Sequence, residues 1–223
     1  MGMHDRTKIV IGEDALKKLR DSKVIIFGIG GVGGYVAEML SRSGIGNLTL
    51  VDFDVVSESN VNRQIVALNS TIGVEKVVVM KNRIGDIDKS INVETKIEKL
   101  TEENINSFNL QSFDYVIDCI DMVKSKIALM KYCYENNIKL ISSMGTGNRN
   151  GIPDFEVKDI YETKDDGLAR VLRRELKKIG VQKATVVCSN NHPISSRELG
   201  SIVYFPASAS CLISACVVEQ LIK

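Results

Sequence analysis

The chain has 223 residues, of which 44% are hydrophobic and 26% are charged, the balance of an ordinary globular protein. A chain of this length can bury enough surface to need neither a metal ion nor a disulfide for its core. The formal net charge of +1 excludes a strong overall attraction to nucleic acid or membranes, so such a partner would have to bind a local patch.

The first residues are polar and are not followed by an apolar run, so we expect no secretory signal. The most apolar stretch, residues 202–221, contains Pro206 and several serines, and no run reaches the ~18 apolar residues of a membrane span. The five cysteines are scattered and include no Cys-x-x-Cys pair, which is typical of reduced thiols. We therefore expect a cytoplasmic protein without a membrane partner.

The predicted helices and strands alternate along the first two thirds of the chain. In chain order, we predict a helix at 14–20, strand 24–29, helix 32–43, strand 48–53, helix 76–91, strands 93–97 and 115–120, helix 124–136 and strand 139–142. Strands at 155–157 and 185–188 and helices at 168–179 and 206–222 follow. This order implies βαβ units and hence an α/β fold with a Rossmann-like, doubly wound, mainly parallel sheet. We expect one domain over residues 1–223, with a nucleotide-binding half at 1–144 and a smaller substrate-side extension at 145–223.

A glycine-rich turn joins the first predicted strand to its helix, with Gly28, Gly30, Gly31 and Gly33 in the pattern G-x-G-G-x-G. Glycine permits a tight turn and a close approach to phosphate oxygens, and the following helix N-terminus attracts an anion. Asp52 ends the next predicted strand, a little over the ~20 residues at which an acidic side chain meets a ribose hydroxyl. These features predict a nucleotide site but do not distinguish NAD from ATP.

Two cations near this site favour a triphosphate. Arg63 carries a planar fork suited to phosphate, and Lys76 opens the next predicted helix as a point charge. Together they would stabilise charge on an α-phosphate that a carboxylate attacks. Taken alone, either residue could equally be an ordinary surface charge.

Two aspartates close the strand at 115–120. Ligands bind outside the carboxyl ends of such strands, and Mg²⁺ binds through one or two carboxylates together with substrate phosphates. We assign the metal to Asp121, whereas Asp118 could equally cap or pair within the structure.

Five motifs follow one another along the chain: G-x-G-G-x-G, V-D-x-D, S-x-S-N-x-N-R-Q, G-x-x-K and D-x-x-D. Their order resembles that of the ThiF-like superfamily, and the resemblance extends from about Arg6 to Leu221. That group contains the sulfur-carrier adenylyltransferases and the ubiquitin-activating enzymes. The resemblance implies ATP and Mg²⁺ as cofactors and a homodimer, with catalytic roles for Arg63, Lys76 and Asp121. It implies nucleotide binding by the four glycines and by Asp52, Asp54, Asn60, Arg63, Gln64, Lys76 and Arg6, the last matching an arginine that often reaches a phosphate across a dimer.

One branch of this superfamily, the enzymes that dehydrate threonylcarbamoyladenosine in tRNA, resembles this sequence more closely. The resemblance lies in segments 60–65, 159–163, 168–176 and 200–206. The branch implies adenylation of the threonylcarbamoyl carboxylate, then ring closure with release of AMP. One alternative is an adenylyltransferase that activates the C-terminus of a ubiquitin-like sulfur-carrier protein, with a sulfur-transfer partner. A nicotinamide-dependent oxidoreductase or a nucleotide sensor is another, which Arg63 and Lys76 argue against.

The sequence departs from the branch in two places. Asp166-Gly167-Leu168 replaces the usual Asp-Pro-Leu, and the short region 190–199 carries serines where some members have a proposed functional cysteine. We therefore assign no catalytic cysteine and expect Cys188 to be buried.

Segment 170–183 is basic, with six cations against Glu175 alone. Without the resemblance it would be an ordinary solvated helix face; with it, the segment is a predicted tRNA contact. The predicted RNA-binding residues are Arg170, Arg173, Arg174, Lys177 and Lys178.

Overall fold

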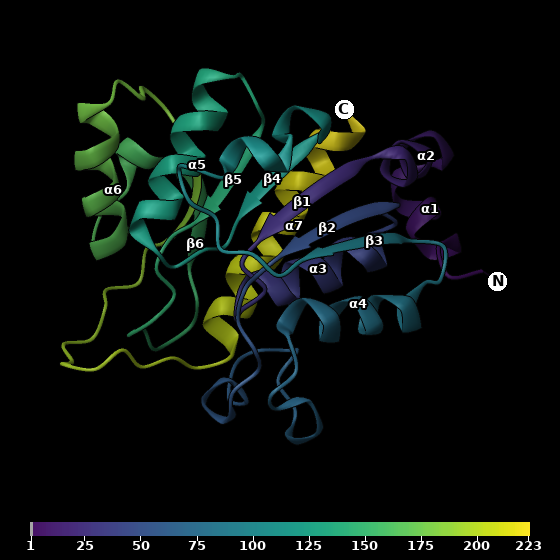
Figure 1. Cartoon of the computed structure of the whole chain (residues 1–223), viewed down its shortest axis with the longest axis horizontal. Helices are drawn as coiled ribbons and strands as arrows, with labels where there is room; N and C mark the ends of the chain where they lie inside the picture. The colour runs from purple at the N-terminus through teal and green to yellow at the C-terminus, as the bar shows by residue number, and fades with distance from the viewer. Residues whose placement is uncertain (1) are drawn as a thin grey trace.

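A computed structural model describes residues 2–223 (Figure 1). One seven-stranded sheet has the order β3-β2-β1-β4-β5-β7-β6, and only β6 runs antiparallel to its neighbour. The strands are β1 Lys23–Phe27, β2 Asn47–Val51, β3 Asn92–Lys96, β4 Tyr115–Asp118, β5 Leu140–Ser143, β6 Phe155–Asp159 and β7 Thr185–Ser189. The predicted α/β, mainly parallel, doubly wound sheet is confirmed.

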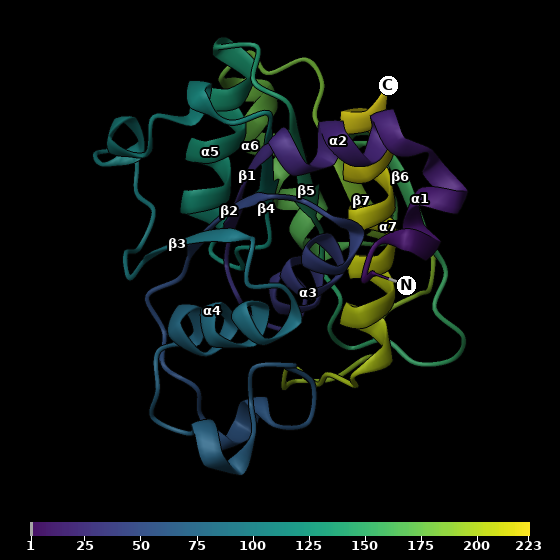
Figure 2. The ribbon, with the colours of Figure 1, turned by 90° about the vertical axis from the view of Figure 1, so that its right-hand side faces the viewer.

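Helices cover both faces of the sheet (Figure 2). The α-helices are α1 Asp5–Ile11, α2 Glu13–Asp21, α3 Gly33–Ser43, α4 Lys76–Ile87, α5 Val123–Glu135, α6 Gly167–Lys178 and α7 Tyr204–Ile222. A core on one face joins the sheet to α3, α4 and α7, and two further cores on the other face involve α5 and α6. This two-sided cover explains why β1, β2 and β4 are runs of buried apolar residues.

Helix α7 is long and apolar enough to span a membrane by length and composition alone. Its residues Phe205, Ala209, Ile213 and Val217 are buried, and the last three pack in the core with α3. The helix is therefore an integral part of the fold, as the apolar sequence at 206–222 predicts.

Most differences from the predicted elements lie at their ends. Strand β1 stops at Phe27 because Gly28 has a positive φ of 86°, and α4 ends at Ile87, where Asp88 returns to extended backbone. Helix α1 was not predicted, since its seven residues carry no clear apolar periodicity and none of them is buried. The short element exposes Ile9 and Val10, which are 76% and 83% accessible.

A buried carboxylate joins α3 to α4. Glu38 accepts hydrogen bonds from Arg83 Nε at 2.6 Å and from Arg42 Nε at 2.7 Å. Burial alone would raise the pKa of Glu38, but the bonds from Arg83 and Arg42 outweigh it and hold this pKa below its usual value. The resulting stabilisation is present above the unfolded-state pKa and is lost as the pH falls through the folded-state pKa.

Replacing Glu38 by Gln should therefore lower the free energy of unfolding at neutral pH by about 2 kcal/mol, the contribution of hydrogen bonds to a charged group. The loss should shrink as the pH falls below the unfolded-state pKa of a glutamate, about 4.3, and through the lower folded-state pKa, where the parent carboxyl becomes protonated too. Urea unfolding of both proteins between neutral and acid pH measures it. A loss that does not change with pH would contradict this account.

Candidate active site

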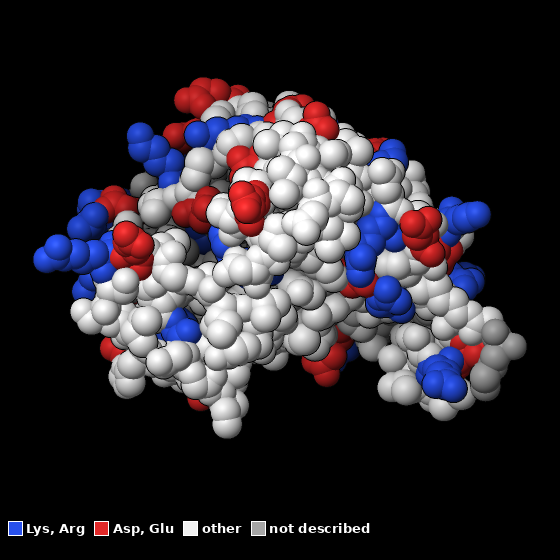
Figure 3. Space-filling model, turned by 90° about the horizontal axis from the view of Figure 1, so that it is seen from below, with Lys and Arg blue, Asp and Glu red and all other residues white. Residues whose placement is uncertain are grey.

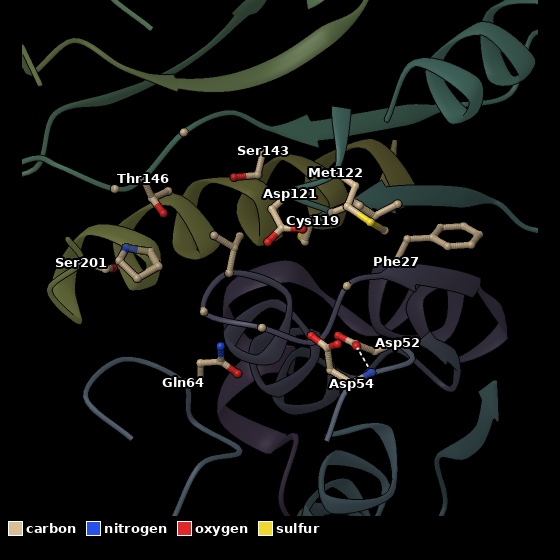
Figure 4. Close-up of a pocket in the computed structure, with 18 of the residues that line it drawn as sticks. Phe27, Asp52, Asp54, Gln64, Cys119, Asp121, Met122, Ser143, Thr146 and Ser201 are labelled. Atoms are coloured by element: carbon tan, nitrogen blue, oxygen red, sulfur yellow. Dashed lines mark hydrogen bonds between the residues drawn. The ribbon is translucent and has the colours of Figure 1, made fainter. Parts of the chain in front are cut away.

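A cleft of about 420 Å³ lies beyond the carboxyl ends of β1, β2, β4 and β5 (Figure 4). Strands β1, β2 and β3 run to one side and β4 and β5 to the other, so the strand order reverses between β1 and β4. Doubly wound sheets bind ligands at this switch point. The lining residues that we predicted are Gly28, Gly30, Gly31, Asp52, Asp54, Arg63, Gln64, Lys76 and Asp121.

The glycine turn is required by close backbone contacts. A Cβ on Gly28 would lie 2.7 Å from the carbonyl oxygen of Cys119, and one on Gly33 would lie 1.8 Å from that of Gly28. Gly33 starts α3 but does not line the cleft, so its role is to let the helix pack against the turn. Gly30 and Gly31, in contrast, present backbone to the cleft at the N-terminal end of α3.

Asp52 fixes the glycine turn. One carboxylate oxygen accepts the Ile29 N–H at 2.6 Å and the other accepts the Asp54 N–H at 2.8 Å. Burial raises the pKa of Asp52, although these two N–H groups and Lys76 oppose the shift. The carboxylate also lines the cleft, and each oxygen keeps acceptor capacity for a ribose hydroxyl.

The two predicted cations differ in how they are held. Lys76 is 6% exposed, and its ammonium lies 2.8 Å from Asp54, whose carboxylate is half exposed. Arg63 is less buried and donates to the backbone oxygen of Ser59 at 2.7 Å and to the Asn62 side chain at 2.9 Å. Lys76 is therefore preorganised at the cleft, whereas Arg63 would exchange weak surface partners for a phosphate.

The structure resolves the two uses left open for Asp118. This side chain is fully buried, lies 2.9 Å from the Lys126 ammonium and accepts a hydrogen bond from Ser142 at 2.6 Å. The Lys126 contact is an ion pair without the alignment of a hydrogen bond. Asp118 thus supports the end of β4, while Asp121 is exposed and faces the cleft.

The carboxylates of the cleft suit a magnesium ion that is bound to a nucleotide. Within residues 2–223, no group of three or more His, Cys, Asp or Glu side chains is placed to hold a metal by itself. Asp54 and Asp121 line the cleft, and Mg²⁺ in phosphate sites uses one or two carboxylates together with phosphate oxygens. The donor set therefore fits the predicted metal.

Besides Gly33, two predicted nucleotide-binding residues lie outside the cleft lining. Asn60 is buried, and its side-chain oxygen accepts the Ser57 N–H at 3.1 Å, which caps a short 3₁₀ turn at Glu58–Asn60. Arg6 is exposed on α1 and does not reach the cleft of its own chain. In this structure Asn60 supports the loop that carries Arg63, and its contact with a nucleotide stays a prediction. The contact of Arg6 with a phosphate across a dimer also stays a prediction.

The sequence prediction missed the far wall of the cleft. The end of β5 and the loop after it, the start of α6, and the loop before α7 with the first turn of α7 line it. The residues are Ser143, Met144, Gly145, Thr146, Gly147, Leu168, Leu199, Gly200, Ser201 and Pro206. The position of 143–147 after a parallel strand could have identified the first group. The others come from distant segments. Two of these, 168–176 and 200–206, carry the resemblance to the tRNA branch, but nothing local in the sequence places them at the cleft.

The predicted RNA-binding cations do not form one set. Arg173 turns inward and donates to the Thr163 backbone oxygen at 2.8 Å and to its hydroxyl, so it belongs to the fold. The exposed ones are Arg170, Arg174, Lys177 and Lys178, two of which also contact Glu175. Lys and Arg gather at the left edge of Figure 3, the side on which α6 lies in Figure 1.

The cysteines differ in burial, and Cys188 is buried as predicted. Burial raises the pKa of Cys188 to about 11 and that of Cys133 to about 12, so both stay protonated near neutral pH. Iodoacetamide at pH 8 should therefore modify the exposed Cys211 well before these two, since the thiolate is the nucleophile. Peptide mass spectrometry against a denatured control measures this order, and modification of Cys188 as fast as Cys211 would contradict it.

Known proteins share this chain's sequence and architecture. It is 44% identical over 194 residues to the tRNA threonylcarbamoyladenosine dehydratase of Bacillus subtilis, covering 86% of this chain and 76% of the relative. The Escherichia coli enzyme of that name is 40% identical over 171 residues, covering 77% of this chain but 64% of the relative. The Haemophilus influenzae molybdopterin-synthase adenylyltransferase is 39% identical over 163 residues, covering 73% of this chain and 66% of the relative.

A solved structure overlaps nearly the whole chain. The E. coli tRNA N6-threonylcarbamoyladenosine dehydratase in complex with ATP superposes with a TM-score of 0.92 at 32% identity, over 97% of this chain and 92% of that one. The profile of the ThiF family matches residues 4–187, which include both sides of the switch point. This chain belongs to the ThiF family.

Proposed function

We propose that this protein uses ATP to adenylate the carboxylate of threonylcarbamoyladenosine in tRNA and then closes the ring with release of AMP. The observation that carries the proposal is the cleft, which gathers the glycine turn, Asp52, Arg63, Lys76 and Asp121 at one switch point. The 0.92 TM-score to an ATP-bound enzyme of that activity supports ATP as the nucleotide and the modified tRNA as the substrate.

The first step would be attack of the carboxylate oxygen on the α-phosphorus, which breaks the bond to the β-phosphate and releases pyrophosphate. The glycine turn and Asp52 would position the nucleotide, and Lys76 and Arg63 would offset charge on the phosphate oxygens. A bound Mg²⁺, held by Asp121 and Asp54, would supply further charge neutralisation. A nucleophile within the modification would then attack the acyl carbon, lose its proton and displace AMP.

The test is to incubate the protein with ATP, Mg²⁺ and tRNA that carries threonylcarbamoyladenosine. Mass spectrometry of the digested nucleosides should show the loss of one water from this nucleoside, together with equal amounts of AMP. Unchanged nucleoside would refute the proposal. Pyrophosphate release that depends on a ubiquitin-like carrier protein and not on tRNA would support the alternative. The 39% identity with a molybdopterin-synthase adenylyltransferase motivates this alternative, which would also involve a sulfur-transfer partner.

We further propose that the exposed cations of α6 contact the tRNA backbone. Charge reversal of Lys177 and Lys178 to Glu should raise the tRNA KM and reduce the salt dependence of binding, since each lost phosphate contact removes about 0.7–0.9 from the slope. The matched control reverses two exposed lysines away from α6: Lys81, on α4, and Lys89, just after that helix. Equal effects in both variants would refute a specific surface on α6.

We also propose a cytoplasmic homodimer in which Arg6 enters the partner's cleft. The exposure of Ile9 and Val10 beside Arg6 on α1 supports an interface there. The Arg6→Ala and Lys76→Ala proteins should each be slow alone. When they are mixed and allowed to exchange subunits, the mixture should regain part of the parental activity, because one cleft of each mixed dimer has both cations. No recovery in a mixture shown to contain mixed dimers would refute this role.

A further inference from the structure

A buried ion pair stands behind the far wall of the cleft, and the proposed chemistry does not use it. Arg149 Nη2 lies 3.0 Å from Asp166 Oδ2, and the two side chains are 2% and 1% exposed. Arg149 is in the loop that follows β5, and Asp166 precedes α6 as its N-cap. The pair therefore sits in the substrate-side extension and apart from Lys76 and Asp54.

The pair ties three chain segments together. Asp166 accepts the Gly145 N–H at 3.1 Å on one oxygen and the Ala169 N–H at 2.8 Å on the other. Arg149 donates to the Gly145 backbone oxygen at 3.2 Å and to the Asn191 backbone oxygen. The loop after β5, the start of α6 and the segment after β7 are thereby held at fixed mutual positions.

Each of these segments builds the far wall of the cleft. Gly145, Thr146 and Gly147 come from the first and Leu168 from the second. The third begins the loop 190–203, which returns to the cleft with Leu199, Gly200 and Ser201. The far end of this loop is held by exposed hydrogen bonds, from Gly200 N–H to the Asn148 side chain at 2.5 Å and from Asn62 to the Ser201 backbone oxygen at 3.1 Å.

Stability alone is a weak reason for such a pair. Desolvation of two buried charges often costs as much as their attraction returns, and apolar residues of similar volume can serve as well. A guanidinium, however, has five N–H groups in a rigid fork and can hold several backbone oxygens at once. The geometry of Arg149 makes use of this capacity, since its acceptors belong to the loops that form the wall.

We infer that Arg149 and Asp166 are positioning residues for the acyl substrate. They hold three parts of the far wall in place: the loop 145–147, Leu168 and the first residues of the loop 190–203. At these positions the wall lets the carboxylate of the substrate reach the α-phosphate of the bound nucleotide. The inference rests on the proposed function for its reaction, but the tethering of the loops can be measured without it.

The kinetic test uses Arg149→Lys, which keeps the charge and loses the fork. We expect the ATP dissociation constant to stay within about twofold and kcat/KM for the modified tRNA to fall roughly tenfold to a hundredfold, the cost of an ångström-scale misplacement. The double variant R149M/D166N removes both charges and keeps an N-cap side chain, so it separates loss of the tether from loss of folding. The control is Arg83→Lys, which weakens the pair with Glu38 on α3 and α4, outside the cleft lining.

The second readout is hydrogen–deuterium exchange of the peptides that cover residues 144–150 and 190–203. Both should exchange faster in the two Arg149 variants than in the parent and in R83K. If the Arg149 variants exchange faster but the parent does not turn over the modified tRNA, the proposed substrate is rejected. The role of Arg149 and Asp166 in holding the loops would still be supported. Folded Arg149 variants with parental exchange and parental tRNA kinetics would overturn the inference, as would equal losses in R149K and R83K.

Discussion

Replacing Lys76 by Ala is expected to slow AMP formation by about two to three orders of magnitude. This is the range found when one preorganised hydrogen-bond donor to the negative charge of a transition state is removed. The ammonium is buried at the cleft and is already held there by Asp54. Little free energy is therefore needed to reorient it when a phosphate binds. Arg63→Ala should cost less, about tenfold to a hundredfold, because Arg63 must first leave Ser59 and Asn62. Single-turnover measurement of AMP with saturating ATP tests both.

The fold should survive these changes. Asp54 is half exposed, so the loss of its partner should alter the free energy of unfolding by less than about 1 kcal/mol. The matched control is Lys81→Ala, an exposed lysine on the same helix. A K76A protein that forms AMP at the rate of K81A would remove Lys76 from the mechanism, and the same comparison applies to Arg63.

The nucleotide side of the cleft could be predicted because its residues lie close together in the sequence and follow local rules. The apolar runs at β1, β2 and β4 mark strands that are buried on both faces, and the carboxyl ends of neighbouring parallel strands must meet. Gly28 and Asp52 therefore had to lie together once the two strands were paired in parallel.

The roles of neighbouring polar residues could not be separated in this way. Asp118 and Asp121 are three residues apart, but one points into the protein toward Lys126 and the other into the cleft. The motif around Asn60 likewise contains a residue that caps its own loop and another, Arg63, that lines the cleft. A pattern of residue types gives no direction for a side chain after a strand has ended.

The far wall was missed because long-range contacts assemble it. Arg149 and Asp166 meet across 17 residues, and Asn191 is 42 residues from Arg149, without periodicity or a motif that links them. The extension at 145–223 contributes β6 and β7 to the same sheet, and α7 packs against α3 of the first half. The two predicted halves therefore form one continuous structure, in which the second supplies the wall that faces the nucleotide site.

Asp121→Asn is expected to raise the Mg²⁺ concentration for half-maximal AMP formation about tenfold or more, since a neutral amide replaces a ligand that Mg²⁺ favours as an anion. The rate at saturating Mg²⁺ should recover in part, because Asp54 and the phosphates remain as ligands. Thermal unfolding of D121N should match the parent, as the side chain is exposed.

Asp118→Asn provides the opposite case three residues away. It leaves Lys126 buried and without its carboxylate, a loss of about 3–5 kcal/mol in the free energy of unfolding. Correction for the folded fraction should leave the Mg²⁺ dependence of D118N close to that of the parent. Parental Mg²⁺ dependence in D121N would show that Asp121 is not a ligand, because the substitution keeps the size and exposure of the side chain and changes only its charge.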